Sequence, residues 1–326
     1  MQQTFRDLIA DNKRKSALLV VVFVLFVAVV AMVLGLAILA YLSPDTVSGL
    51  SWGRALLFGA VGGVAAFLIA LLGYYEGDHF ILATSRAREV QHADDPELFN
   101  VVEEMAIAAG IPMPRVYLIR DPAPNAFATG RSPKDASVAI TTGLRQKLNR
   151  EELQGVMAHE MSHIRNFDIR LMLLMAVLVG TVVMLADLFW QIIWNTPGGR
   201  SSRSSSKDGK GGGIGGLVVL VLVVLAVLLA IIAPILAQII QLAVSRQREY
   251  LADASAVELT RNPQGLASAL KKIDDDPGEL RSANRGTAHL YIANPIKKFE
   301  ARANSAFASH PPLKARIRRL LKLGHD

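Results

Sequence analysis

The amino-acid sequence predicts a predominantly α-helical polytopic membrane protein with a soluble α+β part that contains a small β-sheet. Four apolar stretches, each longer than 20 residues, contain only one charged residue between them, Asp187. A helix needs about 20 apolar residues to cross a bilayer core. The remainder of the chain has the charge density of a soluble protein, although only 19% of all residues are charged. The four stretches are residues 17–42, 55–75, 171–194 and 214–240.

These stretches divide the chain into four parts. Residues 1–75 hold an N-terminal tail and the first two predicted transmembrane helices. Residues 171–240 form a second transmembrane hairpin, whose Ser/Gly-rich loop at 195–213 we expect to be flexible. The soluble segments 76–170 and 241–326 are together large enough for one well-packed domain.

Basic residues predict the orientation of the spans. Arg6, Lys13, Arg14 and Lys15 precede the first span, whereas the short loop after it contains only Arg54. The positive-inside rule then predicts a cytoplasmic N-terminus, and each hairpin returns the chain to that side, so both soluble segments are expected in the cytoplasm. The basic loop after the third span conflicts with this rule, because the predicted topology leaves it outside.

Composition excludes several kinds of site and partner. The chain has no cysteine, which excludes disulfides, a thiol nucleophile and a cysteine-ligated metal. The net charge of +7 is consistent with contact with the anionic headgroups of a lipid bilayer. We find no nucleic-acid-binding motif and expect no nucleic-acid partner.

Residues 159–163 read His-Glu-Met-Ser-His, an H-E-x-x-H pattern. The apolar spacing before it predicts a helix, with Asn149 as its N-cap. On a helix, His159 and His163 lie one turn apart and face the same way, so they can bind one zinc ion while Glu160 reaches its water. The alternative is an exposed polar helix with two surface histidines.

A zinc hydrolase needs a third protein ligand, and Glu249 is the candidate. Asp253 lies four residues later on the same predicted helix face, where it can accept a hydrogen bond from a ligand histidine. His163 lies just before the second hairpin and Glu249 lies just after it. The two ends of a hairpin emerge together from the membrane, so we expect the two residues on the same side. The alternative is a pair of solvated charges that interact with Arg246 or Arg248.

These motifs together resemble the HtpX-type membrane zinc metalloproteases, relatives of the CAAX prenyl protease family. The resemblance covers nearly the whole chain and rests on the following residues: His159–His163 with Asn166 and Asp168, a hydrophobic hairpin, Glu249 with Asp253, Asn125–Gly130, and His310-Pro-Pro312 with Arg316. It implies a zincin-like metalloprotease domain with one Zn²⁺ per chain. It also implies His159, His163 and Glu249 as zinc ligands and Glu160 as the catalytic base.

The tetrahedral oxyanion of peptide hydrolysis needs a further hydrogen-bond donor. The resemblance makes His310 and Arg316 candidates for this catalytic role, and Tyr250 is a weaker one. The alternative is that His310 ends a loop before the basic helix 313–322 and that Arg316 is a surface charge.

Substrate binding is predicted at a strand. Residues 115–119 and 136–141 read as short strands separated by Pro and Gly. Between them, Asn125, Ala126, Phe127, Ala128 and Thr129 form a predicted exposed edge strand, to which an extended peptide could add through main-chain hydrogen bonds. The alternative is an ordinary surface hairpin.

The predicted function is zinc-dependent hydrolysis of peptide bonds in membrane or misfolded proteins at the cytoplasmic membrane surface. The resemblance implies a bacterial-type inner membrane and a role in protein quality control under stress. The alternatives are processing of the kind performed by CAAX prenyl proteases, or a non-proteolytic scaffold with a vestigial metal site. Glu160 argues against a scaffold, because a binding-only zinc site has no use for a base.

Overall fold

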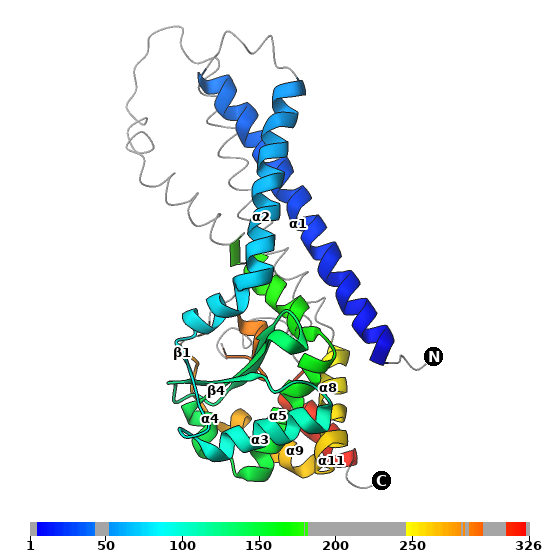
Figure 1. Ribbon diagram of the computed structural model, residues 1–326, viewed down its shortest axis with the longest axis vertical. Helices are drawn as coiled ribbons and strands as arrows, with labels where there is room; N and C mark the ends of the chain where they lie inside the picture. The colour runs from blue at the N-terminus through cyan, green and yellow to red at the C-terminus, as the bar shows by residue number, and fades with distance from the viewer. Residues whose placement is uncertain are drawn as a thin grey trace, which may run out of the picture. The chain divides into compact units, whose positions relative to one another are not determined.

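The protein is described here by a computed structural model, shown as a ribbon in Figure 1. It is predominantly helical with one small mixed sheet, as predicted. The described residues are 5–42, 52–178, 180–181, 246–281, 283, 287–295 and 311–323. The chain divides into two compact units. The first unit comprises Met1–Ala17, Leu72–Val177 and Ile239–Asp326, and the second comprises Leu18–Leu71 and Leu178–Gln238.

Two long helices match the first two predicted spans. These are α1 (Phe5–Leu42) and α2 (Trp52–Thr84), and both are long and apolar enough to cross a membrane. Within the second unit they approach closely at glycine: a Cβ atom added at Gly62 would lie only 2.1 Å from the Ala31 Cβ. Residues 168–178 and 180–181 are also helical and include the first part of the predicted span 171–194, whereas residues 182–194 and the whole predicted span 214–240 lie outside the described residues.

The first unit contains a four-stranded sheet in the order β1-β2-β4-β3. Its strands are β1 (Ala87–Glu89), β2 (Arg115–Ile119), β3 (Ala126–Gly130) and β4 (Ala136–Thr141). Strands β2 and β4 are parallel, whereas β1 and β3 pair antiparallel with β2 and β4. Strand β3 therefore lies at one edge of the described sheet. Gly130 ends it with a φ of 134°, where an added Cβ would lie 2.4 Å from the Asp135 carbonyl oxygen.

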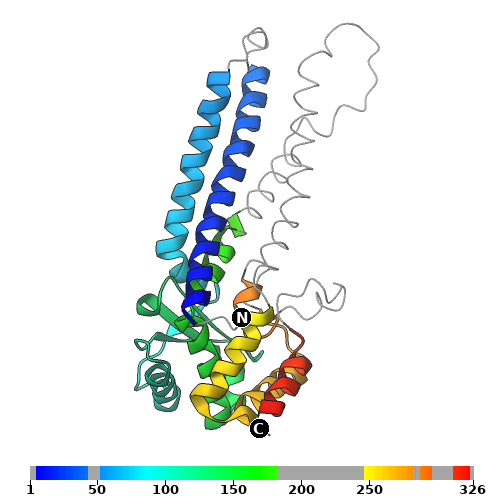
Figure 2. The same ribbon diagram turned by 90° about the vertical axis from the view of Figure 1, so that its right-hand side faces the viewer.

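Helices pack around this sheet. They are α3 (Pro96–Ala109), α4 (Thr142–Lys147), α5 (Arg150–Arg165), α8 (Arg246–Thr260), α9 (Pro263–Asp275) and α11 (Leu313–Leu323), with short 3₁₀ turns η2 (Pro133–Asp135) and η4 (Ala288–Leu290). Helix α5 is central, because it contacts β3, α3, α8 and α9. Figure 2 shows α8, in yellow, alongside the green helix α5.

Helix α5 begins at the predicted cap. The Asn149 side chain accepts a hydrogen bond from the Glu152 N–H, and the Glu152 side chain accepts one from the Asn149 N–H, which forms a capping box. Gly155 lets α9 approach, because an added Cβ would lie 2.7 Å from the Leu266 backbone nitrogen. The buried face of α5 belongs to the main hydrophobic core through Leu153, Val156 and neighbouring residues. This packing holds the motif helix rigidly.

Candidate metal centre

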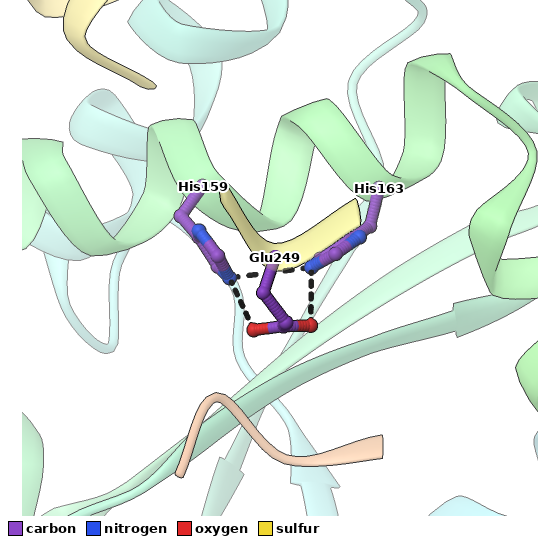
Figure 3. Close-up of side chains that lie close together, drawn as sticks. All are labelled: His159, His163 and Glu249. Atoms are coloured by element: carbon purple, nitrogen blue, oxygen red, sulfur yellow. Dashed lines mark hydrogen bonds and ion pairs between the residues drawn. The ribbon is translucent and has the colours of Figure 1, made fainter. Parts of the chain in front are cut away.

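Three side chains converge at the C-terminal half of α5. Figure 3 shows His159 and His163 projecting from this helix toward the carboxylate of Glu249, which comes from α8. The two Nε2 atoms are 3.2 Å apart, and the Glu249 oxygens lie 3.7 Å from His159 Nε2 and 3.6 Å from His163 Nε2. All three side chains are buried. The predicted alternatives of surface histidines and of solvated carboxylates on α8 are therefore wrong.

The outer nitrogen of each imidazole faces a carboxylate. Asp253 Oδ1 lies 3.1 Å from His159 Nδ1, and Asp168 Oδ2 lies 3.0 Å from His163 Nδ1. Since a carboxylate only accepts hydrogen bonds, each Nδ1 carries the hydrogen in the neutral ring and each Nε2 keeps its lone pair. Two nitrogen lone pairs and a carboxylate thus point at one place, an arrangement that requires a cation or a proton between them.

The donor set fits zinc. A tetrahedral Zn²⁺ with Zn–N distances of about 2.0–2.1 Å places neighbouring ligand atoms about 3.3 Å apart. The ligand atoms of His159, His163 and Glu249 all lie within 4.8 Å of one another. The two Nε2 atoms are 3.2 Å apart, close to the separation expected for two ligands of one zinc ion. Two imidazoles and one carboxylate leave the open fourth position that a catalytic zinc site needs.

In the metal-free protein, the pKa values of the two imidazoles are shifted in opposite directions. Burial, and then the positive charge of Arg316, lower the pKa of His159 to about 4. Burial also disfavours a charged His163, but its hydrogen bond to Asp168 and the charges of Glu249 and Glu160 outweigh burial and raise its pKa to about 9. The surroundings of the two histidines are therefore electrostatically unequal.

Glu160 lies next to this cluster and is almost completely buried. Its Oε1 atom has no hydrogen-bond partner among the described residues, while the Ala128 backbone on β3 contributes a hydrogen bond to the carboxylate. Burial is the main reason why the pKa of Glu160 is raised to about 7. A carboxylate with this pKa can accept and return a proton near neutral pH.

Arg316 is fully buried, so the alternative of a surface charge is wrong. Its Nε and Nη2 atoms donate to both oxygens of Asp253 at 2.9 and 2.7 Å. Its Nη1 atom donates to the Ile292 carbonyl oxygen at 2.7 Å and lies 3.1 Å from Glu249 Oε2. Arg316 thus holds the carboxylates around His159, and its role as an oxyanion donor stays a prediction. His310, the other predicted donor, lies outside the described residues.

The predicted substrate strand lies at the sheet edge but is not exposed. Asn125, Ala126, Phe127, Ala128 and Thr129 are all buried. The segment after η4 covers the outer edge: the Ile292 N–H donates to the Ala126 carbonyl oxygen at 2.9 Å, and the Asn125 side chain donates to the Ala293 carbonyl oxygen at 2.9 Å. The prediction of an exposed strand is therefore wrong, because residues that are distant in sequence pair with it.

Sequence reasoning left two members of this centre without a role. The sequence assigns Asp168, which lies 3.0 Å from His163 Nδ1, no role beyond its part in the resemblance, and its position five residues after the second motif histidine is the available signal. Asn12, which contacts Asp168 from the N-terminal helix, had no signal, since 156 residues separate the two.

The sequence model of Peptidase family M48 matches residues 92–323. The chain is 44% identical to a protein described as "Protease HtpX homolog" from Lactobacillus helveticus, over 96% of this chain and 97% of that protein. A protein of the same description from Caldanaerobacter subterraneus is 42% identical over 99% of both chains. Among solved structures, S. mikatae Ste24p matches with a TM-score of 0.46 and 22% identity, over 79% of this chain and 57% of that chain.

Proposed function

Since this chain belongs to peptidase family M48 and is a membrane-bound zinc metalloendopeptidase, we propose that its catalytic centre is the cluster at the end of α5. His159, His163 and Glu249 hold one zinc ion per chain, and Glu160 is the general base. The observation that carries this assignment is the convergence of two imidazole Nε2 atoms and one carboxylate, each imidazole being held from behind by an aspartate.

The residues of this centre divide the chemistry between them. When bound, zinc supplies Lewis-acid activation of the scissile carbonyl and of water. Glu160 accepts the proton from the attacking water and returns it to the leaving amine. Asp168 and Asp253 fix the orientation of the imidazoles. Arg316 and His310 remain candidates for oxyanion stabilisation.

The substrate is a polypeptide that adds to the outer edge of β3. Two backbone groups of β3 face that edge. The Ala126 carbonyl oxygen accepts a hydrogen bond from the Ile292 N–H, and the Ala128 backbone forms a hydrogen bond with the Glu160 carboxylate. A strand bound there lies beside the proposed general base. Because Ile292 and Ala293 already use the polar groups of Ala126 and Asn125, an incoming peptide has to replace them.

The membrane placement extends the same proposal. Residues 17–42, 55–75, 171–194 and 214–240 are the four spans, and segments 76–170 and 241–326 together form the protease domain. The basic N-terminal tail supports a cytoplasmic N-terminus and active site in a bacterial inner membrane. Misfolded or membrane proteins are the substrates, in a quality-control role under stress. The similarity to proteins described as HtpX homologues favours this role over CAAX-type processing.

The decisive experiment is Glu249→Ala in full-length, detergent-solubilised protein. We expect the bound zinc to fall from one ion per chain to near zero, with loss of chelator-sensitive casein cleavage, because a site with two imidazoles binds zinc weakly. Glu258→Ala is the matched control, since it removes an exposed carboxylate from the same helix. A Glu249→Ala variant that retains stoichiometric zinc would refute the ligand set. Wild-type protein that is fully loaded with zinc but cleaves nothing would favour the scaffold.

A further inference from the structure

A polar chain leads from the metal centre to the N-terminal helix. His163 Nδ1 lies 3.0 Å from Asp168 Oδ2, and the other oxygen of that carboxylate, Oδ1, accepts a hydrogen bond of 2.7 Å from Asn12 Nδ2. Asn12 Nδ2 also donates to the Asn166 carbonyl oxygen at 2.9 Å. The amide group of Asn12 has two donor hydrogens, and both are directed at the same turn.

Asn12 is in an unusual position for its residue type. It lies inside the long helix α1, where asparagine is a weak helix former, yet it is only 2% exposed. A buried amide costs free energy unless it is hydrogen-bonded. The neighbouring residues Asp11 and Lys15 show the ordinary alternative, because they form an exposed ion pair on the same helix. The hydrogen bonds to residues 166 and 168 compensate the burial of Asn12.

The turn that Asn12 contacts is strained. Helix α5 ends at Arg165, and two residues later Phe167 has a φ of +60°. Residues other than glycine rarely adopt this backbone conformation. Such a conformation persists only when its surroundings hold it. Asn12 binds the residues on both sides of Phe167, and the Lys13 ammonium lies 4.8 Å from the centre of the Phe167 ring. The start of α1 therefore clamps the turn that delivers Asp168 to His163.

We propose that Asn12 is a positioning residue of the zinc centre, which it serves by holding Asp168 behind His163. This inference rests on the proposed ligand set. Arg248 Nη1 also approaches the same oxygen, at 3.6 Å, but the Asn12 contact is nearly 1 Å shorter. Asn12 is neutral, so it orients the carboxylate without neutralising it.

The test measures zinc affinity in the full-length, solubilised protein by competition with a chromophoric chelator. Residues behind a metal ligand typically contribute about 10–100-fold to affinity, so we expect Asp168→Ala to weaken binding about 100-fold and Asn12→Ala, one step further out, about tenfold. Asn12→Asp should be at least as harmful as Asn12→Ala, because it sets two carboxylates against each other. Asp11→Asn is the matched control and should bind zinc like the wild type.

A double-mutant cycle separates positioning from a general structural role. If Asn12 acts through Asp168, Asn12→Ala adds no further loss of zinc affinity in an Asp168→Ala background. Equal tenfold losses in both backgrounds would overturn the inference, as would an Asn12→Ala variant within twofold of wild type. If Asn12→Ala does not fold, Asn12→Asp is measured in the same cycle, with the melting temperature of the metal-free protein as the check on folding.

Failure of the underlying ligand set has a different signature. His163→Ala should abolish stoichiometric zinc binding whatever residue 12 is. If His163→Ala binds zinc like the wild type, the ligand set is wrong, and the Asn12 inference falls with it. If His163→Ala loses zinc and Asn12→Ala does not weaken it, only the Asn12 inference fails.

Discussion

The two ends of α5 are built on opposite principles. At the N-terminal end, Glu152 completes a capping box with Asn149 and also accepts hydrogen bonds from Ser268 and Lys272 at 2.6 Å each. At the C-terminal end, Glu160 is buried with Oε1 unpartnered among the described residues, and its pKa is raised to about 7. The hydrogen-bond partners of Glu152 lower its pKa, whereas burial raises the pKa of Glu160.

This contrast shows how one helix combines stability with reactivity. The N-terminal half satisfies its polar groups and packs tightly against α9, so it stabilises the fold. The C-terminal half gathers acceptors that a soluble core would avoid, because a buried acceptor without a partner costs about 1–3 kcal/mol. Catalytic groups need such perturbed environments. The well-packed half therefore positions the reactive half.

The largest expected effect is at Glu160. We expect Glu160→Gln to lower kcat for casein cleavage by about 10⁴-fold, since it removes the proton acceptor, while zinc stoichiometry stays at one per chain. Glu151→Gln, which changes an exposed carboxylate on the same helix, should leave kcat unchanged. Wild-type-like turnover by Glu160→Gln would remove this residue from the mechanism. The C-terminal end of α5 would then no longer differ from the N-terminal end by carrying a catalytic glutamate.

Arg316 tests whether the reactive end is also held by ion pairs. Removing the partner of a buried carboxylate costs about 3–5 kcal/mol, so Arg316→Ala should strongly lower the unfolding free energy of the metal-free protein. Chemical denaturation measures this loss, and Arg319→Ala on the same helix, an exposed side chain, is the control. A purely catalytic oxyanion donor would behave differently: kcat would fall while the unfolding free energy stayed at the wild-type value.

The smallest expected effect is at Glu152. Burial opposes its ionisation, but hydrogen bonds from Lys272, Ser268 and the Asn149 backbone outweigh burial and lower its pKa. Glu152→Gln should therefore cost about 1–2 kcal/mol of unfolding free energy at pH 7. Activity per folded, zinc-loaded molecule should not change.

The sign of the pH dependence follows from the lowered pKa. The contribution of Glu152 is fully present above the pKa of an unfolded glutamate, about 4.3, and is lost as the pH falls through the lower folded value. Denaturation curves between pH 7 and pH 3 should therefore converge for wild type and Glu152→Gln at the acid end. A constant difference across this range would show that the carboxylate charge does not stabilise the N-terminal end.

Local pattern predicted much of this protein. The Asn149 cap and the four-residue histidine spacing are decided within one or two helical turns, so the sequence predicts the start of α5 and the facing imidazoles. The apolar runs similarly predicted α1 and α2. Strands β2 and β4 were found with the bounds expected from their apolar, β-branched residues.

Long-range partners were decided by the tertiary structure alone. The burial of Arg316 against Asp253, the pairing of Ile292 with Ala126 and the contact of Asn12 with Asp168 each join residues more than 60 positions apart. A hydrogen bond leaves no periodic trace in the sequence on either side of it. The sequence by itself determined which groups could bind zinc, because ligand type and helical spacing are local. Which groups hold those ligands depends on how distant segments pack.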